Sequence, residues 1–353
     1  MISNIFYFIL FLLPLIGSIT GFVTINYIII VMGLFSISLL KKIDISYFVF
    51  FIIVTVILSF FQITILEHYD SFKNILYCLS AMFSGYVFIK LRVYEKFNNY
   101  ATLLFIIFSI YMLYHVIIGS NLNEDVFKSG SRNYISVYGL VYTIIAILSC
   151  KNKFNKYCVI FVNLYIAMLA QGRAGLISSL IVSFIFVLDK DIKYKFIYYT
   201  LIASIVFYIF YSYNVIEFIL SRFSEQGFGD TGRSDILTCY YDNFNLSNFF
   251  FGINYGGYDY CGTLAIGRYS LHNSFLSLYS FFGIFSFLIF IMIFLFFIFS
   301  IKDKNYINII LMLALLFRSF TDVVIFFTPI DFIFWVLILS GFIHRAECTK
   351  SEF

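Results

Sequence analysis

Residues 272–300 read HNSFLSLYSFFGIFSFLIFIMIFLFFIFS, an apolar run without a single Asp, Glu, Lys or Arg. An apolar run of roughly 18 or more residues is typical of a helix that crosses the ~30 Å hydrocarbon core of a membrane. Such runs recur along the whole chain, which is 62% hydrophobic and only 12% charged. Soluble domains carry about 25% charged residues, so this chain has too little polar surface to face water. The sequence therefore predicts an all-α polytopic membrane protein and excludes a soluble domain, a disordered chain and a nucleic-acid binder.

We expect about twelve membrane-spanning helices, joined by short connections apart from one long loop. The first apolar run lacks a basic leader and a small-residue cleavage site, so we expect a helix there and not a signal peptide. One integrated membrane domain is expected, with nine spans in residues 1–213, a long loop over 214–271 and three spans in 272–353. The expected spans are 3–19, 22–40, 46–66, 72–90, 100–118, 133–150, 157–171, 174–188, 195–213, 272–300, 306–321 and 327–344.

Charged residues divide the connections into two kinds. Connections after the even-numbered spans hold most of the 23 basic residues, and nearly all of these are Lys. By the positive-inside rule, these connections and both chain termini are cytoplasmic. Since topology requires only positive charge, the preference for Arg on the other side indicates planar, bidentate binding of phosphate or carboxylate groups. The basic residues expected on that periplasmic side are Lys73, Lys128, Arg132, Arg173, Arg222, Arg233, Arg268 and Arg318.

Three of the expected spans begin on the periplasmic side next to a basic residue or a histidine. Arg132 lies at the start of the sixth span, Arg173 at the start of the eighth and His272 at the start of the tenth. The helix dipole disfavours a cation at a helix N-terminus by up to about 1 kcal/mol, so capping does not explain these residues. An anion between them would gain from the side chains, the free backbone N–H groups and the dipoles. The alternative is that the arginines extend towards lipid headgroups.

His272 is the first candidate for a catalytic base. Its position near cations and a helix N-terminus favours the neutral imidazole, which can accept a proton. The alternative is a histidine that holds a neighbouring loop by hydrogen bonds. Asn273 or Ser274 is expected to cap the same helix, because short polar side chains accept hydrogen bonds from the first N–H groups.

Neither a metal site nor a cofactor site is predicted. The four His are scattered, and GFGDTG at 227–232 matches a dinucleotide-binding pattern without the strand that should precede it. Two of the six Cys, Cys239 and Cys261, share the long loop, and we expect a disulfide between them to close it.

Short motifs follow one another in a particular order on the periplasmic side. R-A-G-L begins at Arg173, T-G-R ends at Arg233, and N-F-F-F-G-I-N-Y-G-G follows over residues 248–257. H-N-S-F-L then begins at His272, with Gly283 eleven residues further on.

This set, together with Arg132-Asn133 and with Arg318 near the end of the eleventh span, resembles the O-antigen polymerase and O-antigen ligase superfamily of membrane glycosyltransferases. The resemblance implies a fold related to the C-type glycosyltransferases and an oligosaccharide substrate linked to undecaprenyl diphosphate. It implies a metal-independent, inverting transfer on the periplasmic face of a Gram-negative inner membrane. A co-polymerase that regulates chain length is the protein partner that the resemblance implies, beside membrane lipid.

The resemblance and the chemistry of a diphosphate leaving group together suggest a role for each residue. His272 would take the proton from the attacking sugar hydroxyl, with Asp235 or Glu225 as the alternative base. Arg233 is placed with His272 and Asp235 among the catalytic residues, and the long loop would order over the acceptor sugar. The residues expected to bind the diphosphate and the glycan, and to stabilise the developing charge, are Arg132, Arg173, Arg222, Arg318 and Asn273.

We therefore expect an O-antigen repeat-unit polymerase, which moves the growing glycan from undecaprenyl diphosphate to the non-reducing end of the next lipid-linked unit. The nearest alternative is the ligase that joins finished polymer to lipid A-core, since it would use the same Arg and His residues. A flippase or secondary transporter is a more distant alternative, because transporters favour polar residues at mid-membrane and broken helices.

Overall fold

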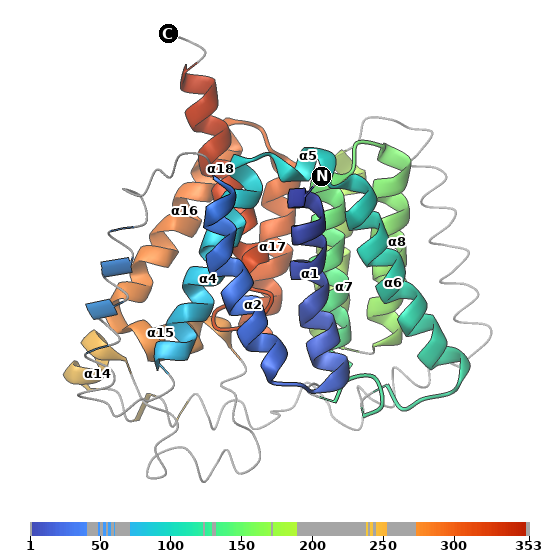
Figure 1. Cartoon of the computed structure of the whole chain (residues 1–353), viewed down its shortest axis with the longest axis horizontal. Helices are drawn as coiled ribbons and strands as arrows, with labels where there is room; N and C mark the ends of the chain where they lie inside the picture. Colours follow the sequence, from blue (N-terminus) through green and yellow to red (C-terminus); the bar gives the residue numbers. More distant parts are fainter. Residues whose placement is uncertain are drawn as a thin grey trace.

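The structure, a computed structural model, is a bundle of helices (Figure 1). It describes residues 2–40, 71–122, 124–128, 132–170, 172–188, 245–252 and 273–350, together with a few single residues between 49 and 60 and between 238 and 242. Every regular element in these ranges is a helix, as the apolar runs of the sequence predict. The predicted span 195–213 and most of the predicted span 46–66 and of the predicted loop 214–271 lie outside the described residues.

The helices follow one another along the chain with short connections in most of the described ranges. Their bounds are α1 Ile2–Thr20, α2 Thr24–Phe35 with the 3-10 helix η1 Ser36–Leu39, α4 Ser71–Lys90, α5 Val93–Lys96, α6 Asn98–Ile117, α7 Arg132–Ser149, α8 Lys153–Leu169, α9 Arg173–Ser183, α10 Ile185–Leu188, α14 Leu246–Phe251, α15 Ser274–Phe282 with the 3-10 helix η2 Gly283–Phe285, α16 Ser286–Lys302, α17 Tyr306–Thr321 and α18 Phe332–Lys350.

Three helical stretches in the described ranges are long and apolar enough to cross a membrane by themselves. They are Ile2–Thr20, Asn98–Ile117 and Ser274–Lys302. Shorter apolar helices stand at Thr24–Leu39, Asn133–Ser149, Arg173–Leu188, Tyr306–Thr321 and Phe332–Phe342, and the less apolar helices α4 and α8 stand at the predicted spans 72–90 and 157–171. The structure is therefore consistent with a helical membrane protein, and the total of twelve spans stays a prediction.

The structure differs from the predicted spans at two places near the end of the chain. The tenth span is predicted as one helix over 272–300, but α15 ends at Phe282 and η2 separates it from α16. Gly283 causes this break, since its φ of +52° lies outside the helical region and suits glycine. The twelfth span is predicted to begin at residue 327, but α18 begins at Phe332, after a non-helical connection over 322–331.

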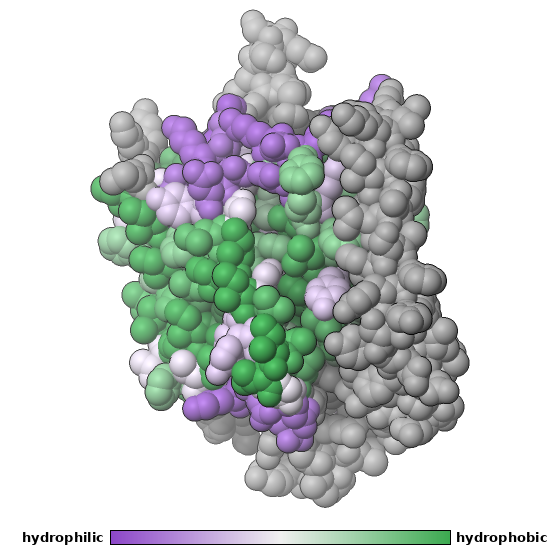
Figure 2. All heavy atoms as spheres, turned by 90° about the vertical axis from the view of Figure 1, so that its right-hand side faces the viewer, coloured by the Kyte–Doolittle hydropathy of each residue, from purple (hydrophilic) through white to green (hydrophobic). Residues whose placement is uncertain are grey.

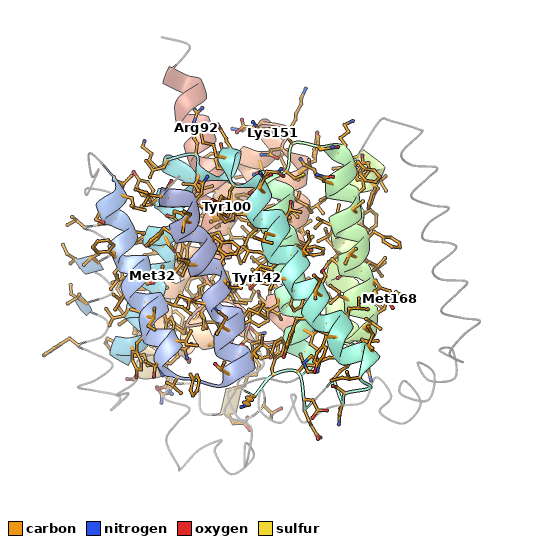
Figure 3. All side chains as sticks on the ribbon, turned by 45° about the vertical axis from the view of Figure 1, so that its right-hand side comes forward. Met32, Arg92, Tyr100, Tyr142, Lys151 and Met168 are labelled. Atoms are coloured by element: carbon orange, nitrogen blue, oxygen red, sulfur yellow. The ribbon has the colours of Figure 1, made fainter. Side chains whose placement is uncertain are left out.

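The face of the bundle seen in Figure 2 carries an apolar band. Figure 2 shows hydrophobic side chains in a broad band between two hydrophilic margins. On α6, Ile106, Ile110, Leu113 and Ile117 are all exposed, which is the arrangement expected of side chains that face lipid. Arg92 and Lys151 lie at one margin, which we call the basic end (Figure 3), and we call the opposite margin the distal end.

Several helix pairs approach closely through small residues, as is usual between helices in membranes. At Gly33 an added Cβ would lie 1.9 Å from the Ser80 hydroxyl oxygen, which brings α2 against α4. At Gly85 it would lie 2.8 Å from the Trp335 Cβ and 3.1 Å from the Trp335 backbone, which brings α4 against α18. The positions of α4 and α18 therefore depend on glycine at residue 85.

We predict that Gly85→Ala lowers the thermal stability of the protein in detergent, although alanine favours a helix over glycine by about 1 kcal/mol. The methyl group would force α4 and α18 apart, and overpacking of this kind costs about 1–3 kcal/mol. Gly17→Ala is the matched control, because its methyl would meet only the Ile25 side chain at 3.3 Å. A melting temperature for Gly85→Ala equal to or above that of Gly17→Ala would contradict this account of the packing.

Candidate functional site

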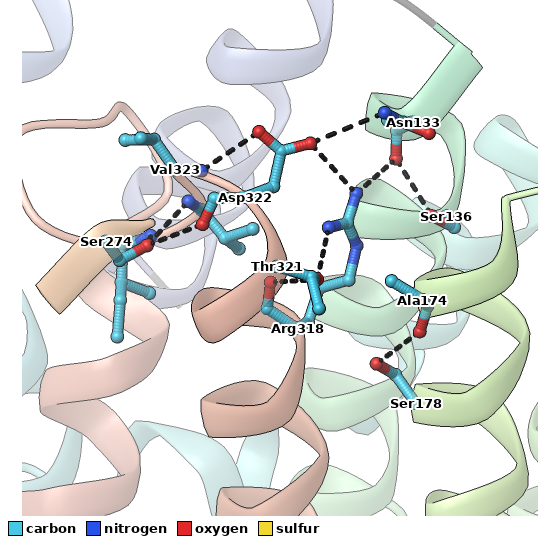
Figure 4. A network of polar contacts seen from close by, with 11 residues as sticks. Asn133, Ser136, Ala174, Ser178, Ser274, Arg318, Thr321, Asp322 and Val323 are labelled. Atoms are coloured by element: carbon cyan, nitrogen blue, oxygen red, sulfur yellow. Dashed lines mark hydrogen bonds and ion pairs between the residues drawn. The ribbon is translucent and has the colours of Figure 1, made fainter. Parts of the chain in front are cut away.

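Three helices begin at one place at the distal end of the bundle, beside the end of a fourth. The first residues of α7, α9 and α15 surround the last turn of α17 (Figure 4). Arg318 of α17 donates through Nη2 to the Asn133 carbonyl at 3.2 Å, and Asn273 donates through Nδ2 to the Phe320 carbonyl at 3.3 Å. At Gly175 of α9, an added Cβ would lie 2.3 Å from the Ser136 side chain of α7. We call Asn133, Ser274, Arg318, Thr321 and Asp322 the polar cluster.

Arg318 is the centre of the polar cluster and is almost completely buried, with 2% of its surface exposed. Its Nη1 donates to the Thr321 hydroxyl at 3.1 Å, and its Nη2 lies 3.5 Å from the Asp322 carboxylate as well as near Asn133. The last turn of α17 also favours a cation, because the helix dipole is negative there. Arg318 therefore joins α17 to the beginning of α7.

Asp322 uses both of its carboxylate oxygens in this arrangement. One oxygen accepts from the Val323 N–H at 3.0 Å, while the other faces Arg318 and the Asn133 side-chain amide, each at 3.5 Å. A buried charge pair of this kind contributes little net stability, but removal of one partner leaves the other charge uncompensated.

Ser274 fixes the beginning of α15 against the connection that follows α17. Its hydroxyl is fully buried and donates to the Asp322 carbonyl at 3.0 Å. The same oxygen accepts from the N–H groups of Val324 at 2.9 Å and Ile325 at 3.2 Å. Asn273, and not Ser274, is the residue that caps α15, since its Oδ1 accepts from Phe275 and Leu276.

A second buried acid, Asp331, stabilises the far end of the connection between α17 and α18. Its Oδ1 accepts from the Thr328 N–H at 3.1 Å and from the Thr328 hydroxyl at 2.5 Å. This turn contains two consecutive residues with positive φ, Phe326 at +65° and Phe327 at +67°, a strained conformation for bulky side chains. The buried Asp331 side chain therefore holds a backbone shape that the local sequence disfavours.

Arg173 is the first residue of α9 and is partly exposed, in contrast to Arg318. The preceding Gly172 lies next to Asn133, because an added Cβ there would be 3.4 Å from the Asn133 Oδ1. Arg132 is the first residue of α7 and directly precedes Asn133, although its side chain lies outside the described residues. The structure thus brings the backbone positions of Arg132 and Arg173 together with Arg318 and Asn273.

The remaining predicted site residues lie outside the described part of the chain. These are Arg222, Glu225, Arg233, Asp235 and His272, and the predicted Cys239–Cys261 disulfide lies there too. His272 directly precedes Asn273, so the chain enters the polar cluster immediately after this histidine. Within the described residues, no three His, Cys, Asp or Glu side chains gather as a metal site would require.

The sequence motifs do not include Thr321 or Asp322, and they mark Ser274 only as a possible cap of the helix. A signal for Asp322 was available, because an acid four residues after Arg318 is a common ion-pair spacing on a helix. No comparable signal marks Ser274, whose partners lie about fifty residues further along the chain.

Comparison of the chain with protein-family models, with curated proteins and with solved structures finds no match.

We predict that Ser274→Ala destabilises the protein by about 1–3 kcal/mol, because buried backbone groups lose their partner. The N–H groups of Val324 and Ile325 would both be left without the hydroxyl oxygen. Ser280→Ala on the same helix is the control, since the Ser280 hydroxyl bonds only to the Ser277 carbonyl of its own helix. Thermal unfolding in detergent measures both, and equal melting temperatures would show that Ser274 does not support the connection.

We also predict an asymmetry within the Arg318–Asp322 pair. Asp322→Ala should cost about 3–5 kcal/mol, because it leaves a buried guanidinium uncompensated. The double variant Arg318→Met/Asp322→Ala should be more stable than Asp322→Ala alone, since it removes that charge. A double variant less stable than the single variant would show that the charge of Arg318 is not what makes Asp322 necessary.

Proposed function

We propose that this protein is a membrane glycosyltransferase that polymerises lipid-linked oligosaccharide repeat units, most specifically those of O-antigen. The observation that carries the proposal is the meeting of three helix N-termini, with Arg173 at one of them and the buried Arg318 behind them. An arrangement of this kind favours a highly charged anion. The motif order that resembles the O-antigen polymerase and ligase superfamily supports the choice of substrate.

A diphosphate has the charge and geometry that this arrangement favours. The N-cap residue of α9, Gly172, makes no side-chain hydrogen bond, so the N–H groups of the first turn of α9 are donors for phosphate oxygens. The N–H groups of Phe275 and Leu276 in α15 are bound by Asn273, but the dipoles of α7, α9 and α15 all add positive potential at the same place. Arg173 is partly exposed, so its planar guanidinium can bind a phosphate with two hydrogen bonds. In our proposal, Arg132 contributes in the same way from the first residue of α7.

Arg318 has a different part in this proposal from the one expected from its sequence position. Its guanidinium is sealed from solvent and already contacts Asp322, Thr321 and the Asn133 carbonyl. We therefore assign it the positioning of the helix that begins with Arg132. Asn273 likewise positions the segment next to His272, because its side chain is occupied as the cap of α15.

The proposed reaction is an inverting group transfer. A hydroxyl of the acceptor sugar attacks the anomeric carbon of the donor glycan, and the bond between that carbon and the diphosphate oxygen breaks. The hydroxyl proton passes to a base, for which we propose His272, with Asp235 or Glu225 as alternatives. Undecaprenyl diphosphate leaves with the electron pair, and its charge is stabilised by Arg132 and Arg173 from the helices and by Arg222 and Arg233 from the loop.

The proposal places this reaction on the periplasmic side of a bacterial inner membrane. By the positive-inside rule the basic end faces the cytoplasm, so the distal end with its polar cluster faces the periplasm. A lipid-linked donor suits that side, because nucleotide sugars are scarce there. The proposed partners are the undecaprenyl-diphosphate-linked oligosaccharide, membrane lipid and a chain-length-regulating co-polymerase, and no metal or cofactor takes part.

We predict that a strain lacking this protein makes lipopolysaccharide with a single repeat unit, and that Arg173→Ala fails to restore the long ladder. Arg173→Lys should restore it only in part, because lysine keeps the charge but loses the planar pair of donors. Arg92→Ala is the control: Arg92 is an exposed arginine at the basic end that pairs with Glu95 on the same turn. Lipopolysaccharide gels, with immunoblots for protein level, measure these outcomes.

The same gels separate the alternatives. Loss of all capped lipopolysaccharide, with polymer accumulating on its lipid carrier, would instead support the ligase. Loss of all capped lipopolysaccharide without carrier-linked polymer in the periplasm would support a flippase. Full restoration of the ladder by Arg173→Ala would contradict the anion-binding role at the start of α9.

A further inference from the structure

The short helix α14 has a feature that the proposed reaction does not use. Two side chains four residues apart, Leu246 and Phe250, lie on one face of this helix and are 75% and 42% exposed. Its N-terminus is closed by Asn245, whose side-chain oxygen accepts from the Asn248 N–H at 2.8 Å. Burial of this exposed apolar pair against an apolar surface would be favourable.

The helix α14 is docked on the break between α15 and α16 by a contact between two glycines. At Gly252, an added Cβ would lie 2.2 Å from the Ser280 carbonyl oxygen, and at Gly283 it would lie 2.2 Å from the Phe250 carbonyl oxygen. Both glycines have positive φ, +92° and +52°, so other residues would be strained there for a second reason. The Tyr279 hydroxyl also donates to the Phe249 carbonyl at 2.9 Å. The backbones on the two sides are therefore in direct contact.

The length of α16 sets the depth of this contact in the membrane. From Lys302 at the basic end, the helical rise of 1.5 Å per residue places Ser286 about 24 Å away, and the three residues of η2 add about 6 Å. The break at Gly283 thus lies about 30 Å from the basic end, which matches the thickness of the hydrocarbon core. Figure 1 accordingly shows α14 at the distal margin of the bundle, away from the N-terminus.

The neighbouring surface is apolar and exposed. Phe285 belongs to the turn on which α14 docks and is 40% exposed, and Phe287 and Phe294 of α16 are exposed further along the same helix. Aromatic side chains, Trp and Tyr above all, are enriched at the level of the headgroups in membrane proteins. Short amphipathic helices bind the same level with their apolar face in the acyl-chain boundary.

We propose that α14 is an interfacial anchor whose Leu246 and Phe250 side chains insert into the lipid of the distal leaflet. Because of the Gly252–Gly283 contact, the depth of α14 in the membrane also fixes the depth of α15, the helix that begins at the polar cluster. The anchor would thereby hold the polar cluster at a constant distance from the headgroups. This inference stands on the geometry of α14 and does not require the proposed transferase activity.

Tryptophan fluorescence in reconstituted bilayers tests the anchor. The chain has a single Trp, Trp335, which is 1% exposed and supplies a constant background from wild-type protein. We expect Phe250→Trp to be quenched by phosphatidylcholine brominated close to the glycerol backbone more than by lipid brominated near the chain ends. Phe294→Trp, on the exposed face at the middle of α16, is the matched control and should show the reverse order.

Three results would overturn the proposal. Quenching of Phe250→Trp by aqueous iodide without quenching by lipid would place α14 in water. Protection from both would mean that protein covers this face, and preferential quenching by the deep bromines would place the helix too far into the membrane. Leu246→Trp gives a second, independent reading if Phe250→Trp does not yield monodisperse protein.

The glycine contact is tested in the same bilayers. Addition of Gly283→Ala to Phe250→Trp should move the fluorescence from lipid quenching towards iodide quenching, because the methyl group would collide with the Phe250 carbonyl. Unchanged lipid quenching in this double variant would show that α14 holds its depth without the contact, which would contradict the proposed link between the depths of α14 and α15.

Discussion

Hydrocarbon offers no hydrogen bonds, and this constraint governs the distal half of the protein. A non-helical segment buried at membrane depth must find partners for its own N–H and C=O groups within the protein. The connection over 322–331 meets this requirement at both ends: Ser274 binds the N–H groups of Val324 and Ile325, and Asp331 binds that of Thr328. Because Ser274 also begins α15, the shape of the connection and the position of that helix are set together.

The sequence was sufficient to predict the helical, membrane-embedded class, because long apolar runs allow little else. The continuous helices α1 and α6 lie where single runs predict spans. The break at Gly283 was not predicted, since a glycine within an apolar run is also compatible with an unbroken membrane helix. At this break Gly283 lies against the backbone of residues 250–252, and this contact with a separate segment of the chain cannot be read from residues 272–300 alone.

The candidate site was predictable as a set of positions but not as a set of roles. The positions of the Arg residues are informative because they lie at helix ends. The helix dipole disfavours a cation at the N-terminus and favours one at the C-terminus. Burial is what distinguishes Arg318 from Arg173, and burial is decided by Asn133, Thr321 and Asp322 from two helices. A sequence pattern that marks both arginines alike cannot tell a residue that meets a ligand from one that holds helices together.

Helix length then determines the electrical environment of the site. The helix α17 rises about 24 Å from the basic end, so its last turn stops about 6 Å short of the far boundary of a ~30 Å hydrocarbon core. The starts of α7, α9 and α15 meet it at that depth, just inside the level that we infer for α14.

At such a boundary the effective dielectric constant is lower than in water, so dipoles and guanidinium groups act more strongly on a charged ligand. In the proposed function, the lipid carrier would present its diphosphate just beyond this depth, at the headgroups, since its hydrocarbon tail and its sugars lie on opposite sides of that group. The short helices are therefore what would let a membrane-bound substrate meet the helix N-termini without leaving the bilayer.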